Sequence, residues 1–409
     1  MKSALLLMVM LAGSVVGRDA LAQDAPPKAI EELIQTLMRK GVITEPEARP
    51  ILDLFSKEQK DQKPEVSSLW LPKGVSLKMG TLGQFRYTYS RGDLRVGTNP
   101  TSSFKVHTAR LKFSGDLPMT FKYALTLAFE RANGATTQAN SALYDAKLIY
   151  APKAWLNITA GQFVIPVSAE SNIPSDQIDL AERYYAAGRM LNPSTNRDVG
   201  VMADGKLLNK RLYYALGMFN GRGPNYADNS DSMHLYAARL EGTPLRWTMS
   251  GQPSGLLVGI NGMWKRTSND PSSLKSSDIP GRSFTQPFDR YVWSYNGTLS
   301  VGPAALKGEY LAAKLKGLVP IDPVVNAEGW YVQGSVKTLG GRLEPLARYQ
   351  GYQPDDAVID AKDLRWTTLG LNWYINGQSS RLLANYTFKR ERRGAYANDE
   401  LVLQYQLSF

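Results

Sequence analysis

The feature that most limits the fold of this chain is an alternation of apolar and polar side chains from Val75 to the last residue, Phe409. Successive side chains of a β-strand point to opposite sides of the sheet, so a period of two predicts strands with one apolar and one polar face. The final segment shows this most clearly. One of its faces is apolar (Leu401, Leu403, Tyr405, Leu407, Phe409), and the other is mostly polar (Val402, Gln404, Gln406, Ser408). The pattern therefore predicts an all-β fold.

About sixteen such segments follow one another, each near the roughly 9 to 11 residues that a tilted strand needs to cross a bilayer. Short turns are expected at 115–119, 152–153, 302–303, 340–341 and 376–378. Long polar loops are expected at 91–103, 164–196, 267–287 and 351–362, and the segment 242–254 is long for a turn on the short side. Short turns on one rim and long loops on the other are typical of outer-membrane barrels.

We therefore predict that residues 71–409 form a sixteen-stranded antiparallel transmembrane β-barrel in the bacterial outer membrane. The alternative is a secreted all-β protein, such as a jelly roll or a β-helix, in which the alternation reflects only a half-buried sheet.

Residues 1–22 have the features of a signal peptide that is removed after export. Lys2 precedes an apolar run from Ala4 to Val16, and the sequence Ala20-Leu21-Ala22 fits a signal-peptidase site. No later segment reaches the roughly 18 consecutive apolar residues of a transmembrane helix.

Residues 23–70 are predicted to form a short periplasmic helical segment and a linker. One apolar helical face is formed by Ile30, Leu33, Ile34, Leu37 and Met38. This segment either self-associates or serves as a semi-ordered spacer.

The formal net charge is +11, and the alternation predicts where the charges lie. A basic side chain on the lipid face costs roughly 2 to 4 kcal/mol near the midplane, so the polar face is expected to line a water-filled pore. The predicted pore-lining and anion-binding residues are Arg86, Arg110, Lys112, Lys122, Asp145, Lys147, Arg342, Arg348, Arg365 and Arg381. Barrel closure would bring the arginines of the first and last strands into one arc of the wall, which predicts anion preference. The alternative is that many of these side chains pair with acids and stiffen the wall.

The segment 164–196 is the longest between two predicted strands and is expected to fold inward as a constriction loop. Its charged residues are Glu170, Asp176, Asp179, Glu182, Arg183 and Arg189. The excess of acids would weaken anion selectivity or bind a cation; alternatively, the acids would neutralise wall arginines and anchor the loop. We favour the second interpretation.

Three stretches resemble the phosphate-selective porin O and P family: "LYDAKLIYAPKAWLNITAGQFVIPVSAE", "RDVGVMADGKLLNKRLYYALGMFNG" and the helical "IEELIQTLMRKGVITEPEA". The resemblance implies a sixteen-stranded barrel, usually trimeric, with a basic ladder that leads to a central anion site. It places Arg86, Arg110 and Asp145 near that site. The implied partners are small anions, phosphate among the candidates, together with outer-membrane lipid and lipopolysaccharide.

Catalysis finds little support in the sequence, because the chain has no cysteine and its only histidines are His107 and His234. No metal site, cofactor or nucleic-acid partner is predicted. Two other functions stay open. One is a general or sugar-permeable diffusion porin, in which Tyr184, Tyr185 or Tyr331 would begin an aromatic slide, and the other is a structural outer-membrane scaffold barrel.

Overall fold

The computed structural model describes residues 71–409, except 93–97, 132–141, 192–195, 227–228, 230–232, 250, 268–283, 285–286, 321, 360–361 and 395. Pro72–Phe409 form one compact unit. The predicted signal peptide at 1–22 and the predicted helical segment at 23–70 lie outside the described residues.

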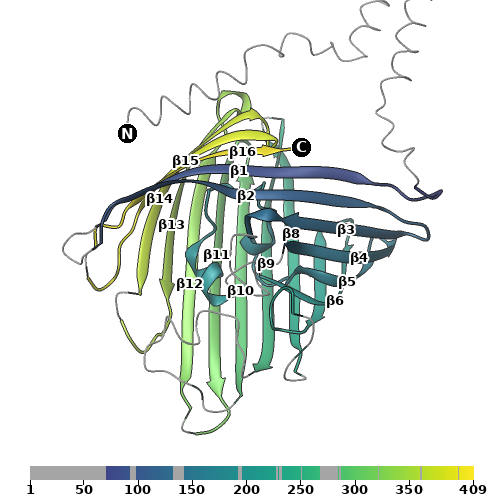
Figure 1. Ribbon diagram of the computed structural model, residues 1–409, viewed down its shortest axis with the longest axis horizontal. Helices are drawn as coiled ribbons and strands as arrows, with labels where there is room; N and C mark the ends of the chain where they lie inside the picture. Colours follow the sequence, from purple (N-terminus) through teal and green to yellow (C-terminus); the bar gives the residue numbers. More distant parts are fainter. Residues whose placement is uncertain are drawn as a thin grey trace, which may run out of the picture. The chain divides into compact units, whose positions relative to one another are not determined.

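Sixteen antiparallel strands of the described part of the chain close into one barrel. The strands are β1 (Lys78–Ser90), β2 (Thr101–Asp116), β3 (Phe121–Ala128), β4 (Leu143–Lys153), β5 (Leu156–Val164), β6 (Arg197–Leu207), β7 (Leu212–Phe219), β8 (Leu235–Met249), β9 (Gln252–Thr267), β10 (Phe288–Val301), β11 (Ala304–Gly317), β12 (Val324–Val336), β13 (Leu343–Gln353), β14 (Leu364–Asn376), β15 (Ser380–Phe388) and β16 (Glu400–Ser408). The last strand pairs with the first, from Leu82 opposite Ser408 to Ser90 opposite Glu400 (Figure 1). The predicted strand number and barrel closure are confirmed.

The alternation sorts side chains between the two faces of the wall. In β14 the outward residues Leu369, Leu371 and Trp373 are exposed, whereas Thr368 and Asn372, on the alternate phase, are buried inside the barrel. In β16 the same rule buries Gln404 and Gln406 and turns Leu407 outward. The outer surface is therefore an apolar band, as hydrocarbon requires. None of the described helices has the length and hydropathy needed to cross a bilayer.

The short turns lie where the alternation predicted them, with one correction. The segment 242–254 is not a long turn, because β8 continues to Met249 and β9 starts at Gln252. The interruption near Gly242 is a register shift between Gly242 and Leu245 inside the β8–β9 hairpin. An irregularity of this kind breaks the polarity pattern without ending the strand.

Two β-bulges alter the phase of strands on the inner wall. In the β1–β2 pair, Gln84 lies opposite Thr108 and Phe85 opposite Val106, which leaves His107 as the extra residue. In the β3–β4 pair, Tyr144 is the extra residue between Leu143 and Asp145. A bulge re-aims the side chain that it inserts, and both His107 and Tyr144 line the cavity described below.

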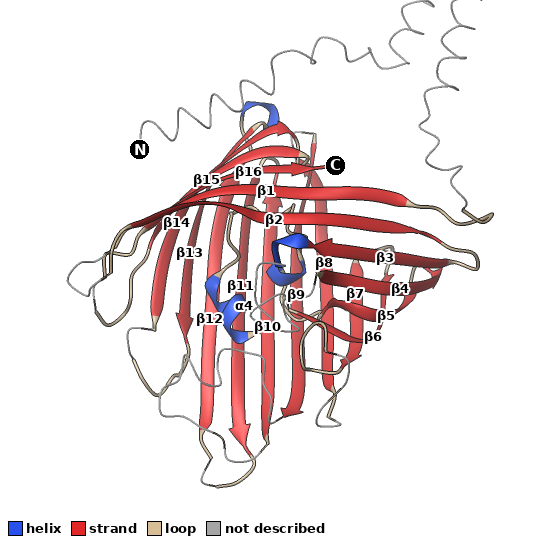
Figure 2. Cartoon of the chain, viewed as in Figure 1, coloured by secondary structure: helices blue, strands red, loops and turns tan. Residues whose placement is uncertain are grey.

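The segment 165–191 folds into the barrel and contains the short helices η5 (Glu170–Asn172) and α4 (Tyr185–Met190), the second of which is labelled inside the wall in Figure 2. Its apolar side chains form a buried cluster with inward residues of β5 and β7–β14. The cluster includes Phe163, Val167, Tyr184, Ala186, Met190, Leu191, Phe219, Leu235, Met263, Phe288, Val292, Leu311, Leu315, Val325, Tyr331, Tyr352 and Leu364. Gly329 permits close contact, since a Cβ there would lie 2.0 Å from the Ala186 Cβ. This apolar packing holds one side of the loop against the wall.

Candidate functional site

The acids of the inward loop pair with bases of the barrel wall. Glu170 accepts a hydrogen bond from Arg348 at 2.5 Å, and both side chains are 3% exposed. Asp176 pairs with Lys112 at 3.0 Å. Two further ion pairs join Asp179 to Lys307 and Glu182 to Arg86. The predicted anchoring role of the loop acids agrees with these contacts.

Backbone carbonyls of the loop accept hydrogen bonds from the same part of the wall. Arg381 donates to the carbonyl oxygen of Ile178 at 2.8 Å. Gln406 donates to the carbonyl oxygen of Asp176 at 3.0 Å, and Asn372 donates to that of Asp179 at 2.8 Å. Together with the ion pairs, these bonds cover the inner surface of β11–β16 and β1 with the loop.

The predicted arc of six arginines is wrong in three respects. Arg86, Arg348 and Arg381 face inward but are buried beneath the loop. Arg342 is exposed and lies in the turn before β13. Arg365 lies on the outward phase of β14, with its guanidinium 5.5 Å from the ring centre of Trp330. Charged residues on the outer phase cost little near a membrane interface, so the alternation rule fails at the end of a strand.

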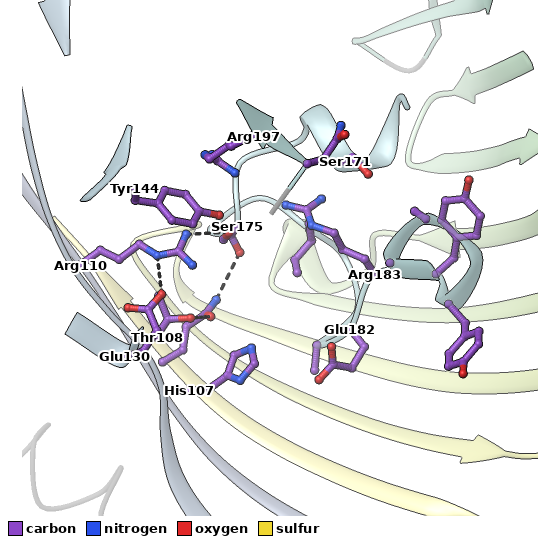
Figure 3. A pocket seen from close by; sticks show the side chains of 18 of the residues that line it. His107, Thr108, Arg110, Glu130, Tyr144, Ser171, Ser175, Glu182, Arg183 and Arg197 are labelled. Carbon is purple, nitrogen blue, oxygen red and sulfur yellow. Dashed lines mark hydrogen bonds and ion pairs between the residues drawn. The ribbon is translucent and has the colours of Figure 1, made fainter. Parts of the chain in front are cut away.

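A cavity of about 550 Å³ remains between the loop and the inner faces of β1–β6. It is lined by four arginines (Arg110, Arg183, Arg189, Arg197) and two glutamates (Glu130, Glu182). Figure 3 labels all of these except Arg189. Only Arg110 in this set of bases was predicted on the wall, and Arg183 and Arg189 come from the predicted loop. The lining therefore keeps an excess of positive charge after the loop has paired its acids.

Tyr144 is held between two guanidinium groups. The Arg110 guanidinium lies 3.9 Å from the ring centre and that of Arg197 lies 3.7 Å from it (Figure 3). Figure 3 shows the two groups on either side of the ring, which attracts cations by its quadrupole. Arg110 also donates to Glu130 at 2.7 Å and to Ser175 at 3.0 Å, and Arg197 donates to Asp145 at 2.9 Å. The contacts orient both planar groups at the cavity wall.

Arg183 approaches the cavity from the loop side. Its guanidinium donates to the backbone carbonyl oxygens of Glu170 and Ile173. Burial lowers the pKa of Arg183, the Glu170 charge opposes this, and the nearby Arg197 and Arg110 charges lower the pKa further. An arginine stays protonated despite such a shift. An anion in the cavity would relieve the repulsion among these three guanidinium groups.

Lys122 and Lys147, also predicted to line the pore, are not among the residues that line this cavity. Lys147 is on the inward phase of β4, and Lys122 is exposed at the start of β3. The Arg189 guanidinium lies 5.3 Å from the ring centre of Tyr185. Arg197 and Tyr144 were missed, because Arg197 alternates with the inward Asp198 and the Tyr144 bulge has no sequence signal. Within the described ranges, no three His, Asp or Glu side chains gather as a metal site.

The comparison with protein families decides the classification. The family described as phosphate-selective porin O and P matches residues 80–409. This chain belongs to that family. The porin is therefore an outer-membrane β-barrel diffusion channel. No curated protein matches it by sequence.

Solved structures resemble the porin in fold at low sequence identity. An anion-selective porin from Comamonas acidovorans superposes with a TM-score of 0.58 at 13% identity, covering 82% of this chain and 100% of that one. OmpT of Vibrio cholerae gives 0.55 at 12%, covering 83% and 99%. The outer membrane channel DcaP of Acinetobacter baumannii gives 0.53 at 14%, also covering 83% and 99%. At these identities the likeness concerns the fold alone.

Neutralising Glu182 tests the charge balance of the cavity, because its side chain is 60% exposed. Glu182→Gln keeps a carbonyl oxygen for Arg86 and removes one negative charge. We expect the anion-to-cation permeability ratio of the porin to rise about fivefold, because one charge over about 8 Å of water changes the energies of the anion and of the cation by roughly 0.5 kcal/mol each, in opposite directions. Reversal potentials measure this ratio. Glu328→Gln on the outward phase of β12 is the matched control and should leave it unchanged. A shift of the Glu182 variant towards cations would contradict the expectation.

Proposed function

We propose that the porin is a passive channel that prefers small anions, and that oxyanions bind between Arg110, Arg183 and Arg197. One observation carries the proposal: the loop acids Glu170, Asp176 and Asp179 are directed to wall bases, whereas the cavity retains four arginines against two glutamates. A wall with an excess of one sign raises the local concentration of counter-ions.

Guanidinium groups favour oxyanions over halides in this geometry. A planar guanidinium offers paired N–H donors that match the oxygens of phosphate or carboxylate. Arg110 and Arg197 are held by Tyr144 and by their acidic partners, so little side-chain freedom is lost on binding. We therefore propose that the site binds small oxyanions, and phosphate is the member of this class that we would test first.

The reversal potential of the purified porin across a KCl gradient in a planar bilayer tests anion preference. We expect the sign that corresponds to chloride permeating faster than potassium. Phosphate added to the same channels should reduce the chloride current, and the reduction should saturate as the phosphate concentration rises. A cation-selective reversal potential would refute the proposal, and an anion-selective channel without phosphate block would refute the oxyanion site alone.

Assembly and export are also proposed. We expect a homotrimer that contacts outer-membrane lipid and lipopolysaccharide, cleavage after Ala22, and a periplasmic position for residues 23–70. Mass spectrometry of the mature chain and of the assembled porin in detergent measures the cleavage site and the number of copies.

A further inference from the structure

A second cavity, of about 270 Å³, lies between loop residues 180–185 and the inner faces of β13–β16. We call it the β13–β16 cavity. The segment Ala181–Tyr185 separates it from the arginine-lined cavity, because residues of this segment line both. The β13–β16 cavity adjoins the strand ends that are connected by long loops. In barrels of this kind the long loops lie on the extracellular side.

One wall of the β13–β16 cavity is aromatic. The rings of Tyr185 and Trp366 are 4.8 Å apart and meet edge to face at 61°. Tyr352 supports Tyr185 from behind, with ring centres 5.4 Å apart. The Lys389 ammonium lies 4.9 Å from the ring centre of Trp366. Rigid rings of this kind offer a large apolar contact area at small entropic cost.

The barrel wall beside Trp366 carries uncharged hydrogen-bonding groups. The hydroxyls of Thr368 and Thr387 lie 3.0 Å apart, and each keeps acceptor capacity beyond that contact. Asn385 accepts from the Ala181 N–H at 2.7 Å, and Gln350 accepts from the Tyr185 N–H at 2.8 Å. These bonds fix the orientation of both amides, because each amide oxygen is directed to a backbone N–H of the loop. The hydrogen-bond donors of Gln350 are then the two N–H bonds of its amide nitrogen.

The charges of the β13–β16 cavity are closer to balance than those of the arginine-lined cavity. Its lining has three bases (Arg183, Arg348, Lys389) and two acids (Glu182, Glu400). Lys389 pairs with Glu400 at 3.2 Å, Arg348 pairs with Glu170, and Arg183 donates to the backbone carbonyl oxygens of Glu170 and Ile173. Each base therefore has a partner within the protein, so the charges favour an anion less here than in the arginine-lined cavity.

We infer that the β13–β16 cavity is a subsite for an uncharged, hydroxyl-bearing ring, that is, one pyranose unit of a sugar. A sugar ring has an apolar face for Tyr185 and Trp366, and its hydroxyls both donate and accept, as the threonine hydroxyls and the amides require. The volume is below the range of drug-sized pockets, which suits a single ring. The inference rests on the proposed function only in requiring an open channel, and it holds whichever ion permeates faster.

Sugar-dependent block of the ion current tests the subsite in the full-length porin. Glucose is the probe, and mannitol, an open-chain polyol, is the control for viscosity. We expect glucose to reduce the KCl current saturably and mannitol to reduce it only in proportion to concentration. Equal, non-saturating effects of both compounds, or saturable block by benzoate in place of glucose, would overturn the inference.

Variants of one strand locate the effect. Trp366→Leu removes the aromatic wall, and we expect the glucose concentration for half-block to rise about tenfold. Trp366→Phe keeps a ring, and the indole N–H that it removes has no hydrogen-bond partner among the described residues. Glucose should therefore block this variant at the same half-block concentration as the wild type. Trp373→Leu on the outward phase of β14 is the matched control. An unchanged half-block concentration in Trp366→Leu would refute the site.

Two further readings keep the outcomes separate. If Trp366→Leu yields no channels, Tyr185→Leu removes the neighbouring ring, which the loop contributes, and should weaken glucose block similarly. The reversal potential recorded on the same channels reports the proposed anion preference. Loss of glucose block with an unchanged reversal potential supports the subsite, whereas a cation-selective channel with intact glucose block refutes only the anion proposal.

Discussion

Replacing Arg110 and Arg197 together by alanine should raise the phosphate concentration that half-blocks the chloride current about 100-fold. Each guanidinium can make charge-assisted hydrogen bonds worth roughly 1.5–3 kcal/mol, or about tenfold or more in affinity. The change also leaves Glu130 and Asp145 without their basic partners Arg110 and Arg197. The reversal potential should therefore move towards cations at the same time.

The chain offers matched controls for this double variant. Arg365→Ala removes an arginine from the outward phase of β14, and Arg342→Ala removes one from the turn before β13. Each control lowers the net charge by one, as each of the two substitutions in the double variant does. Neither control changes a residue that lines the arginine-lined cavity. Phosphate block should stay at the wild-type concentration in both. If Arg110→Ala/Arg197→Ala is blocked as readily as these controls, the two arginines are not the oxyanion site.

Arg348→Met should loosen the inward loop more than any other single change on the wall. The substitution leaves Glu170 charged, 3% exposed and without Arg348. Removing one partner of a buried ion pair costs roughly 3–5 kcal/mol, because the remaining charge is desolvated without compensation. We expect a larger and noisier single-channel conductance, and unfolding in detergent at a lower denaturant concentration.

A second substitution and an exposed pair serve as tests of this explanation. Arg348→Met/Glu170→Gln removes both charges and keeps an oxygen for the Tyr184 N–H, which Glu170 accepts at 3.0 Å. It should recover most of the lost stability. Lys112→Met breaks a pair whose lysine is 37% exposed and should cost less than about 1 kcal/mol. A conductance in Arg348→Met equal to that of the wild type would show that the apolar cluster alone holds the loop.

Much of the barrel could be predicted because alternation is a local property of the backbone. The phase of β16, from Leu401 to Phe409, is legible in the sequence and is the one that the structure shows. The inward position of the loop followed from its length, and the pairing of its acids followed from its composition. The wrong prediction of a long turn at 242–254 also has a local cause. A register shift near Gly242 disturbs the alternation without ending the strand.

The candidate site was predicted less well, because it depends on which surfaces cover one another. Arg86, Arg348 and Arg381 have the inward phase that the sequence indicates, yet the loop buries all three. Arg348 meets Glu170 across 178 positions of the chain. Such a contact has no trace in the local pattern of either strand or loop.

By itself, the sequence determined that this protein is a sixteen-stranded barrel with an apolar outer face, a basic interior and an acidic inward loop. Only the tertiary structure decided which basic residues remain at the cavity: Arg110 and Arg197 around Tyr144, with Arg183 from the loop. The physical reason is that strand phase follows from neighbouring residues. Burial, ion pairing and the bulge at Tyr144 arise only when distant segments pack together.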